Sequence, residues 1–189
     1  MTEVSSLTGR LLVATPALAD PNFDRAVVLL LDHDEKGSLG VVLNRPTPVD
    51  VGDILEGWGE LAGEPGVVFQ GGPVSLDSAL GVAVIPGGAS ADGPLGWRRV
   101  HGAIGLVDLE VPPELLAAAL GSLRIFAGYS GWGPGQLQDE LSEGAWYVVE
   151  SEPGDVSATR PEGLWRAVLR RQRSELAMVA TYPDDPSLN

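Results

Sequence analysis

The chain has 189 residues, of which 44% are hydrophobic, and its formal net charge is −14 at pH 7. This length is typical of one compact domain, and the excess of acidic groups opposes binding to nucleic acids and to anionic membrane surfaces. The absence of cysteine excludes disulfides and thiolate chemistry, and the two histidines, His33 and His101, lack metal-ligand spacing. We therefore expect no metal and no cofactor, although acidic oxygen ligands could still hold magnesium or calcium.

The first half of the chain predicts short strands joined by turns. Apolar runs bounded by glycine, proline and aspartate mark the strands, which we expect over residues 11–15, 26–31, 39–43, 67–69 and 80–85. The continuous apolar run at residues 26–31 is typical of a strand with both faces covered. A turn at residues 34–37 joins it to the next strand, so the two form a buried hairpin. Asp50 is expected to cap a short helix at residues 51–55.

The second half predicts an alternation of strands and helices. We expect strands over residues 104–109, 123–127 and 145–149, and helices over residues 112–120, 136–141 and 161–173. Residues 86–96 are rich in Gly, Ala, Ser and Pro, which indicates a mobile loop. The polar residues 182–189 are expected to form a disordered or loosely docked tail.

These elements predict an α+β fold with a mixed sheet, in a single domain over residues 1–181. The early hairpin argues against the alternative, a purely parallel sheet in three layers. The apolar run at residues 11–18 contains Thr15 and Pro16 and is short for an export signal. No run approaches the length of a membrane span, so we expect a cytoplasmic protein.

Glycines and aromatic residues are densest at residues 126–141, where we predict a strand, a tight glycine turn and a helix start. Gly128-Tyr129-Ser130-Gly131-Trp132 is similar to the nucleophile elbow of serine hydrolases, but a tryptophan stands where that turn needs glycine. A phosphate cradle before the helix is a second interpretation, although the usual lysine and hydroxyl are missing. The simplest interpretation has Gly133 as the helix cap and Pro134 as its first residue.

Two further clusters, Gly40-Val41-Val42-Leu43-Asn44-Arg45-Pro46 and Gln70-Gly71-Gly72-Pro73, fall at predicted strand ends, where ligands often bind. If both meet the glycine turn, they form a glycine-lined groove. The predicted groove residues are Asn44, Arg45, Gly71, Gly72, Pro73, Tyr129, Ser130, Gly131, Trp132 and Gln136. Alternatively, the glycines only satisfy turn geometry and Arg45 pairs with a carboxylate. An exposed aromatic, Trp58 or Trp132, is another candidate for contact with a partner.

Several blocks, in their order and spacing, resemble the AlgH/YqgE family of bacterial proteins. The blocks are Leu7-Thr8-Gly9, residues 12–16, Asp20-Pro21-x-Phe23, residues 40–46, Gly71-Gly72-Pro73 and residues 128–137. The resemblance implies a strongly bent mixed sheet that partly closes like a barrel, with helices packed outside. Members are commonly labelled transcriptional regulators, and the resemblance supplies no catalytic residue. Gln138 stands where relatives usually carry glutamate.

Three functions remain open. We favour a regulatory module without assignable catalysis, which binds an unknown protein partner or a small anionic metabolite in the groove. The alternative is a small enzyme acting on an anionic metabolite, with Arg45, Gln136 and a carboxylate such as Asp139. Direct DNA binding is opposed by the net charge, and would need a basic face. Its candidate residues are Arg98, Arg99, Arg166, Arg170, Arg171 and Arg173.

Overall fold

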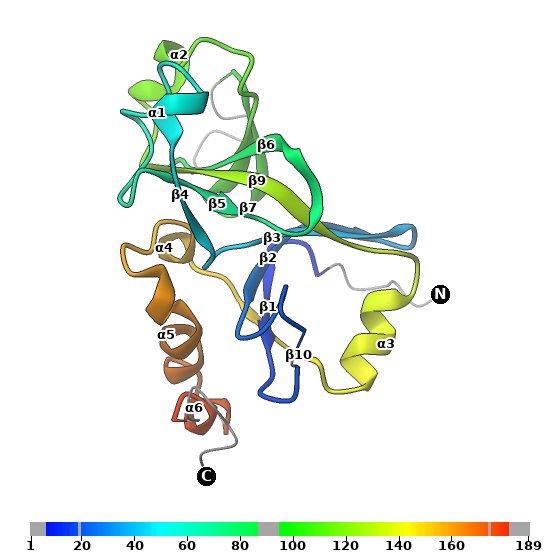
Figure 1. The fold of residues 1–189 in the computed structure, drawn as a ribbon. Coiled ribbons are helices and arrows are strands. Elements are labelled where there is room, and N and C mark those ends of the chain that lie inside the picture. The colour runs from blue at the N-terminus through cyan, green and yellow to red at the C-terminus, as the bar shows by residue number, and fades with distance from the viewer. Residues whose placement is uncertain (1–6, 19, 87–94, 174, 182–189) are drawn as a thin grey trace.

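The computed structural model describes residues 7–18, 20–86, 95–173 and 175–181, and within them ten strands form one curled sheet (Figure 1). The strand order is β10-β1-β2-β3-β9-β6-β8-β7, and β5 joins β4 to β9. The strands are β1 (Arg10–Ala14), β2 (Val27–Asp34), β3 (Gly37–Val42), β4 (Pro46–Asp50), β5 (Val67–Gln70), β6 (Val74–Val84), β7 (Trp97–His101), β8 (Ile104–Val107), β9 (Ser122–Trp132) and β10 (Trp146–Glu150). The β5–β9 pair is parallel and its neighbours are antiparallel, so the predicted mixed sheet is confirmed.

Short helices pack outside this sheet. They are α1 (Val51–Ile54), α2 (Glu114–Ala117), α3 (Gln136–Ser142), α4 (Pro153–Val156), the 3-10 turn η1 (Pro161–Gly163), α5 (Leu164–Arg170) and α6 (Leu176–Val179). Figure 1 shows α1 and α2 together at one end, and α3 and α5 on opposite sides of β1 and β2. The predicted α+β class, with helices outside a bent sheet, is confirmed. Among the described residues, no helix is long and apolar enough to cross a membrane.

The apolar run of β1 is covered on both faces, and that of β2 likewise. Leu11 and Val13 share one core cluster with Trp165 of α5, whereas Leu12 belongs to a second cluster with Leu137 of α3. Because successive side chains of a strand point to opposite faces, neighbouring residues reach different helices. These strands therefore do not require a polar residue at every second position. This agrees with the prediction, from the continuous apolar run, that both faces are covered.

The strand predicted to end at residue 127 continues to Trp132, so the predicted glycine turn is confined to residues 133–135, directly before α3. The first part of β9 pairs with β5 and β6, and its last residues pair with β3. Gly128 stands between the two parts with φ +74, a left-handed conformation that glycine adopts at little cost. Gly128 therefore redirects the strand from one part of the sheet to the other.

The start of α3 also differs from the prediction. The helix begins at Gln136 with Gly135 as N-cap, so Gly133 is not the cap and Pro134 is not the first helical residue. Asp50 precedes α1 as predicted, but its side chain makes no capping hydrogen bond.

Other differences concern elements that the sequence patterns did not predict or extended too far. The helix expected over residues 161–173 is η1 followed by α5, and the one expected over residues 112–120 is the four-residue α2. The elements β4, β7, α4 and α6 were not predicted, because each is short and lacks a long periodic pattern. The expected tail at residues 182–189 and most of the expected mobile loop at residues 86–96 lie outside the described residues.

Arg124 anchors β9 to two loops. Its side chain is 2% exposed, and its Nη2 donates hydrogen bonds of 3.0 Å to the carbonyl oxygens of Glu64 and Ala158. The guanidinium lies 4.2 Å from the ring centroid of Phe69. Burial lowers the pKa of Arg124 to about 10, so the group is still cationic at neutral pH.

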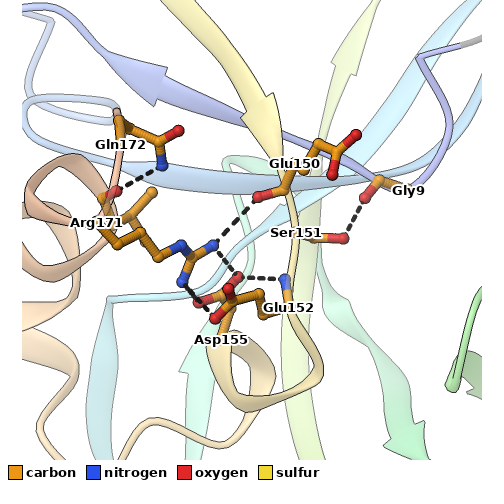
Figure 2. Close-up of polar contacts among 8 residues, drawn as sticks. Gly9, Glu150, Ser151, Glu152, Asp155, Arg171 and Gln172 are labelled. Carbon is orange, nitrogen blue, oxygen red and sulfur yellow. Dashed lines mark hydrogen bonds and ion pairs between the residues drawn. The ribbon is translucent and has the colours of Figure 1, made fainter. Parts of the chain in front are cut away.

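An ion pair fixes the end of α5 to the chain after β10 (Figure 2). Arg171 contacts both carboxylate oxygens of Asp155, at 2.6 and 2.8 Å, and donates to the carbonyl oxygen of Glu150 at 3.1 Å. The Asp155 side chain is 4% exposed and also accepts the N–H of Glu152. The hydrogen bond to Asp155 raises the pKa of Arg171. This bidentate pair sets the position of α5 against the sheet.

Replacing Arg171 should destabilise the fold, because the Arg171→Ala variant leaves the buried carboxylate of Asp155 without its cation. The pair is partly exposed on the arginine side, so we expect a loss of about 2–3 kcal/mol in the free energy of unfolding, measured by urea denaturation. The neighbouring Arg170 is exposed, and Arg170→Ala should change the free energy by less than about 0.5 kcal/mol. Equal losses in the two variants would contradict a specific role for the ion pair.

Candidate functional site

A recess lies where β3, β5 and the chain before β2 meet, and we call it the Arg45 recess. Its volume is about 140 Å³. It is lined by Pro21, Asn22, Val42, Arg45, Gln70, Gly72 and Pro73. Three separated segments of the chain therefore form one concave site, and two of them are the clusters that the sequence placed at strand ends.

The Gly71-Gly72 turn is held tightly against β3 and β9. The carbonyl oxygen of Gly71 accepts hydrogen bonds from the Val42 N–H at 2.8 Å and from the buried Ser130 Oγ at 3.0 Å. A Cβ atom at Gly72 would overlap the main chain of Tyr129 and the Ser130 hydroxyl. A side chain is therefore excluded at Gly72, and the close approach of the two chains shapes one wall of the recess.

Arg45 supplies the positive charge of this recess. Its guanidinium donates hydrogen bonds to the main-chain carbonyl oxygens of Asp24 and Asn44. Burial lowers the pKa of Arg45, and the nearby Asp24 carboxylate opposes that shift. An arginine remains protonated at neutral pH. The site thus holds a partly desolvated cation whose described hydrogen bonds go to carbonyl oxygens.

Asn44 and Tyr129 contribute differently from the prediction. Asn44 is buried, and its side chain binds the main chain of Arg25 and Val27, at 2.9 and 3.0 Å. Tyr129 pairs with Val74 across β9 and β6. Together with Ser130 and Gly71, these residues support the recess from behind and are not among its lining residues.

Gly131, Trp132 and Gln136 lie away from the recess. Gly131 and Trp132 pair with β3 residues, and Gln136 donates to Glu140 at 3.0 Å from the first turn of α3. The three turns predicted to form one groove therefore do not all meet. The structure joins the first two clusters, and of the third only Tyr129 and Ser130 contact them, whereas Gly131, Trp132 and Gln136 lie on the side of α3.

Glu140 organises the α3 side through two buried indoles. Its Oε1 accepts hydrogen bonds from the Nε1 atoms of Trp132 and Trp146, at 3.0 and 2.9 Å. The exposed fraction of Trp132 is 6% and that of Trp58 is 3%, so the idea that either is an exposed aromatic is wrong. Both belong to hydrophobic cores because each side chain is covered by a neighbouring helix or loop.

Four lining residues, Pro21, Asn22, Val42 and Gln70, are not among the predicted groove residues. Pro21 and Asn22 fall within the Asp20-Pro21-x-Phe23 block of the family resemblance, which assigns them no role. Since β1 and β2 are antiparallel neighbours, the segment joining them lies at the end of the sheet where β3 also ends. A hairpin assignment for the first two strands would have placed it there.

The described residues contain no group of three or more acidic or histidine side chains arranged to hold a metal ion. The residues that line the Arg45 recess include Arg45, Asn22 and Gln70, whose side chains carry a guanidinium and two amides. Such donors suit an oxyanion and not a cation.

Comparison with known proteins identifies relatives over the whole chain. The family described as AlgH-like matches residues 11–177. A UPF0301 protein from Streptomyces avermitilis is 91% identical over 190 residues, which cover 100% of this chain and 98% of the relative. A crystal structure of a protein from Corynebacterium diphtheriae has a TM-score of 0.89 at 31% identity, covering 96% of this chain and 95% of that one. The solution structure of the AlgH protein from Pseudomonas aeruginosa has a TM-score of 0.68 at 28% identity, covering 97% of both chains.

The Gly72→Ala substitution tests the close approach behind the recess. The added methyl group overlaps the main chain of Tyr129, so we expect the free energy of unfolding to fall by roughly 2–3 kcal/mol. Gly154 in α4 has open space around its Cα, and Gly154→Ala should be neutral or slightly stabilising. Thermal unfolding followed by circular dichroism measures both, and a Gly72→Ala variant as stable as the parent would refute the contact.

The Glu140→Ala substitution tests the anchor of α3. Two buried indole N–H groups lose their acceptor, which should cost roughly 2–3 kcal/mol of unfolding free energy and change the near-ultraviolet circular dichroism of the tryptophans. The exposed Glu143 provides the matched control, and Glu143→Ala should leave both quantities unchanged. An unchanged tryptophan spectrum in Glu140→Ala would show that these hydrogen bonds do not form.

Proposed function

The chain belongs to the AlgH-like family, and we propose that it is a binding module for a small carboxylate-bearing metabolite. The observation that carries the proposal is that Arg45, Asn22 and Gln70, whose side chains can donate hydrogen bonds to an anion, line one recess. These groups come from three segments of the chain. Their meeting in a concave site is what a ligand-binding role requires.

The chemistry of the recess suits one carboxylate group. A guanidinium presents planar N–H donors that match the two oxygens of a carboxylate, and amide N–H₂ groups add neutral donors. Desolvation of Arg45 by burial weakens its charged form in the unliganded protein. A bound anion would replace the hydration that the buried guanidinium has lost, and this would favour binding. The volume of about 140 Å³ limits the ligand to a small acid.

Binding is favoured over catalysis. The lining residues supply donors for an anion, but none of them is a nucleophile or a general base. The enzyme alternative needs Gln136 and Asp139 beside Arg45, whereas both belong to α3, away from the recess. The protein is therefore still proposed to be a regulatory module, but its binding site is the Arg45 recess and not the glycine-lined groove.

As part of the same proposal, the module acts in the cytoplasm, and the occupancy of its recess by the ligand alters its interaction with a protein partner. The net charge of −14 opposes direct contact with DNA, since phosphate neutralisation requires a basic face. Arg98 and Arg99 lie in β7, the terminal strand of the sheet order, and do not join the arginines of α5 around one cavity. A regulatory effect would therefore require an intermediary protein.

Acetate and succinate, titrated against chloride of equal ionic strength, are the probes that test this function. We expect both to raise the melting temperature and to bind in isothermal titration calorimetry. Arg45→Ala should abolish the binding, and Gln70→Ala should weaken it by about tenfold, the loss expected for one hydrogen bond to a charged group.

Arg10 is exposed on β1 and does not line the recess, so Arg10→Ala makes the same change in net charge without touching the site. It should bind both probes as the parent does. Binding that persists in Arg45→Ala, or falls equally in Arg10→Ala, would contradict the proposal.

A further inference from the structure

A second and larger cavity lies on the other side of Arg45, and we call it the Trp165 cavity. Its volume is about 360 Å³. It is lined by Asp24, Arg25, Asn44, Arg45, Glu162, Trp165 and Arg166. Three of the arginines of this acidic chain thus border one cavity, and they come from the turn before β2, the end of β3 and helix α5.

Trp165 brings two of these guanidinium groups together. The guanidinium carbon of Arg25 lies 4.5 Å from the centroid of the indole ring, and that of Arg166 lies 5.7 Å from it. The ring is 2% exposed, and its Nε1 donates to the carbonyl oxygen of Ala14 at 2.8 Å. The face of an aromatic ring attracts cations, so the fixed indole helps to hold both guanidinium groups beside the cavity.

The main chain of Arg25 is also fixed by a buried group. Arg25 has φ +55, which is uncommon for a residue with a side chain. The buried Asn44 holds this conformation by donating to the Arg25 carbonyl oxygen at 2.9 Å and accepting the Val27 N–H at 3.0 Å. The direction of the Arg25 side chain is therefore set by the core and not by solvent.

The charges of the cavity do not cancel. Its lining contains three arginines and two carboxylates, Asp24 and Glu162, so it carries one more positive than negative group, whereas the whole chain has a net charge of −14. The two described hydrogen bonds of Arg45 go to carbonyl oxygens, and a guanidinium has five N–H donors. The cavity is thus the place in this fold where an anion would find several guanidinium donors at once.

We propose that the Trp165 cavity binds the phosphate group of a small phosphorylated metabolite. Three arginines from different segments line this cavity, and a set of several guanidinium donors suits the three or four oxygens of a phosphate better than the two oxygens of one carboxylate. The volume exceeds that of a phosphate and falls within the range of small-molecule sites. The site is distinct from the Arg45 recess, although Arg45 borders both.

Inorganic phosphate, titrated calorimetrically against chloride of equal ionic strength, is the probe for this site. Arg25→Asn removes the guanidinium but keeps a residue that tolerates a positive φ, and Arg166→Gln keeps a donor for the Ala180 carbonyl oxygen. We expect the parent protein to bind phosphate, and each variant to bind it at least about tenfold more weakly. Arg170→Gln, on the exposed face of the same helix, makes an identical change in charge and should bind as the parent does.

No binding by the parent, or equal weakening in Arg170→Gln and Arg166→Gln, would overturn the inference. Gln70 lines only the Arg45 recess, so Gln70→Ala should leave phosphate binding unchanged while it weakens acetate binding. Phosphate binding without acetate binding would reject the proposed function alone. Acetate binding without phosphate binding would reject this inference alone.

Discussion

The bend of β9 at Gly128 is the constraint on which the rest of the structure depends. Up to Tyr129 the strand pairs with β5 or β6, and from Ser130 it pairs with β3, so one strand belongs to both parts of the curled sheet. This path brings Tyr129 and Ser130 against Gly72, where a Cβ atom would not fit. The wall of the Arg45 recess is therefore a consequence of how the sheet curls.

Arg45 links this architecture to the two proposed anion sites. It stands between the Arg45 recess and the Trp165 cavity, and both depend on elements fixed elsewhere: Gly72 by β9, and Trp165 by α5, whose end is tied through Arg171 to Asp155. Since one guanidinium borders both sites, an anion in one alters the field felt by an anion in the other. Occupancy of the two sites should therefore be coupled, which is a property that a regulatory module needs.

The sequence predicted the strands that carry long apolar runs and the two polar clusters at their ends, because periodicity and turn residues are local signals. It failed where tertiary pairing overrides a local signal: Gly128 and Gly131 indicate a turn, yet the hydrogen bonds to β3 keep the chain extended through Trp132. Trp132 was a candidate for a binding surface, but its indole is buried and donates its N–H to Glu140, eight residues later in the chain. The contribution of Asn22 could not be predicted, since it depends on which strands are neighbours.

A nuclear magnetic resonance titration with acetate tests the central claim most directly, because the side-chain Nε–Hε signal of Arg45 reports on the guanidinium itself. The account predicts saturable shifts of that signal and of the Gly72 amide, with little change at Gly131 and Gln136. Shifts confined to residues of α3, or an Arg45 signal that does not respond, would contradict it.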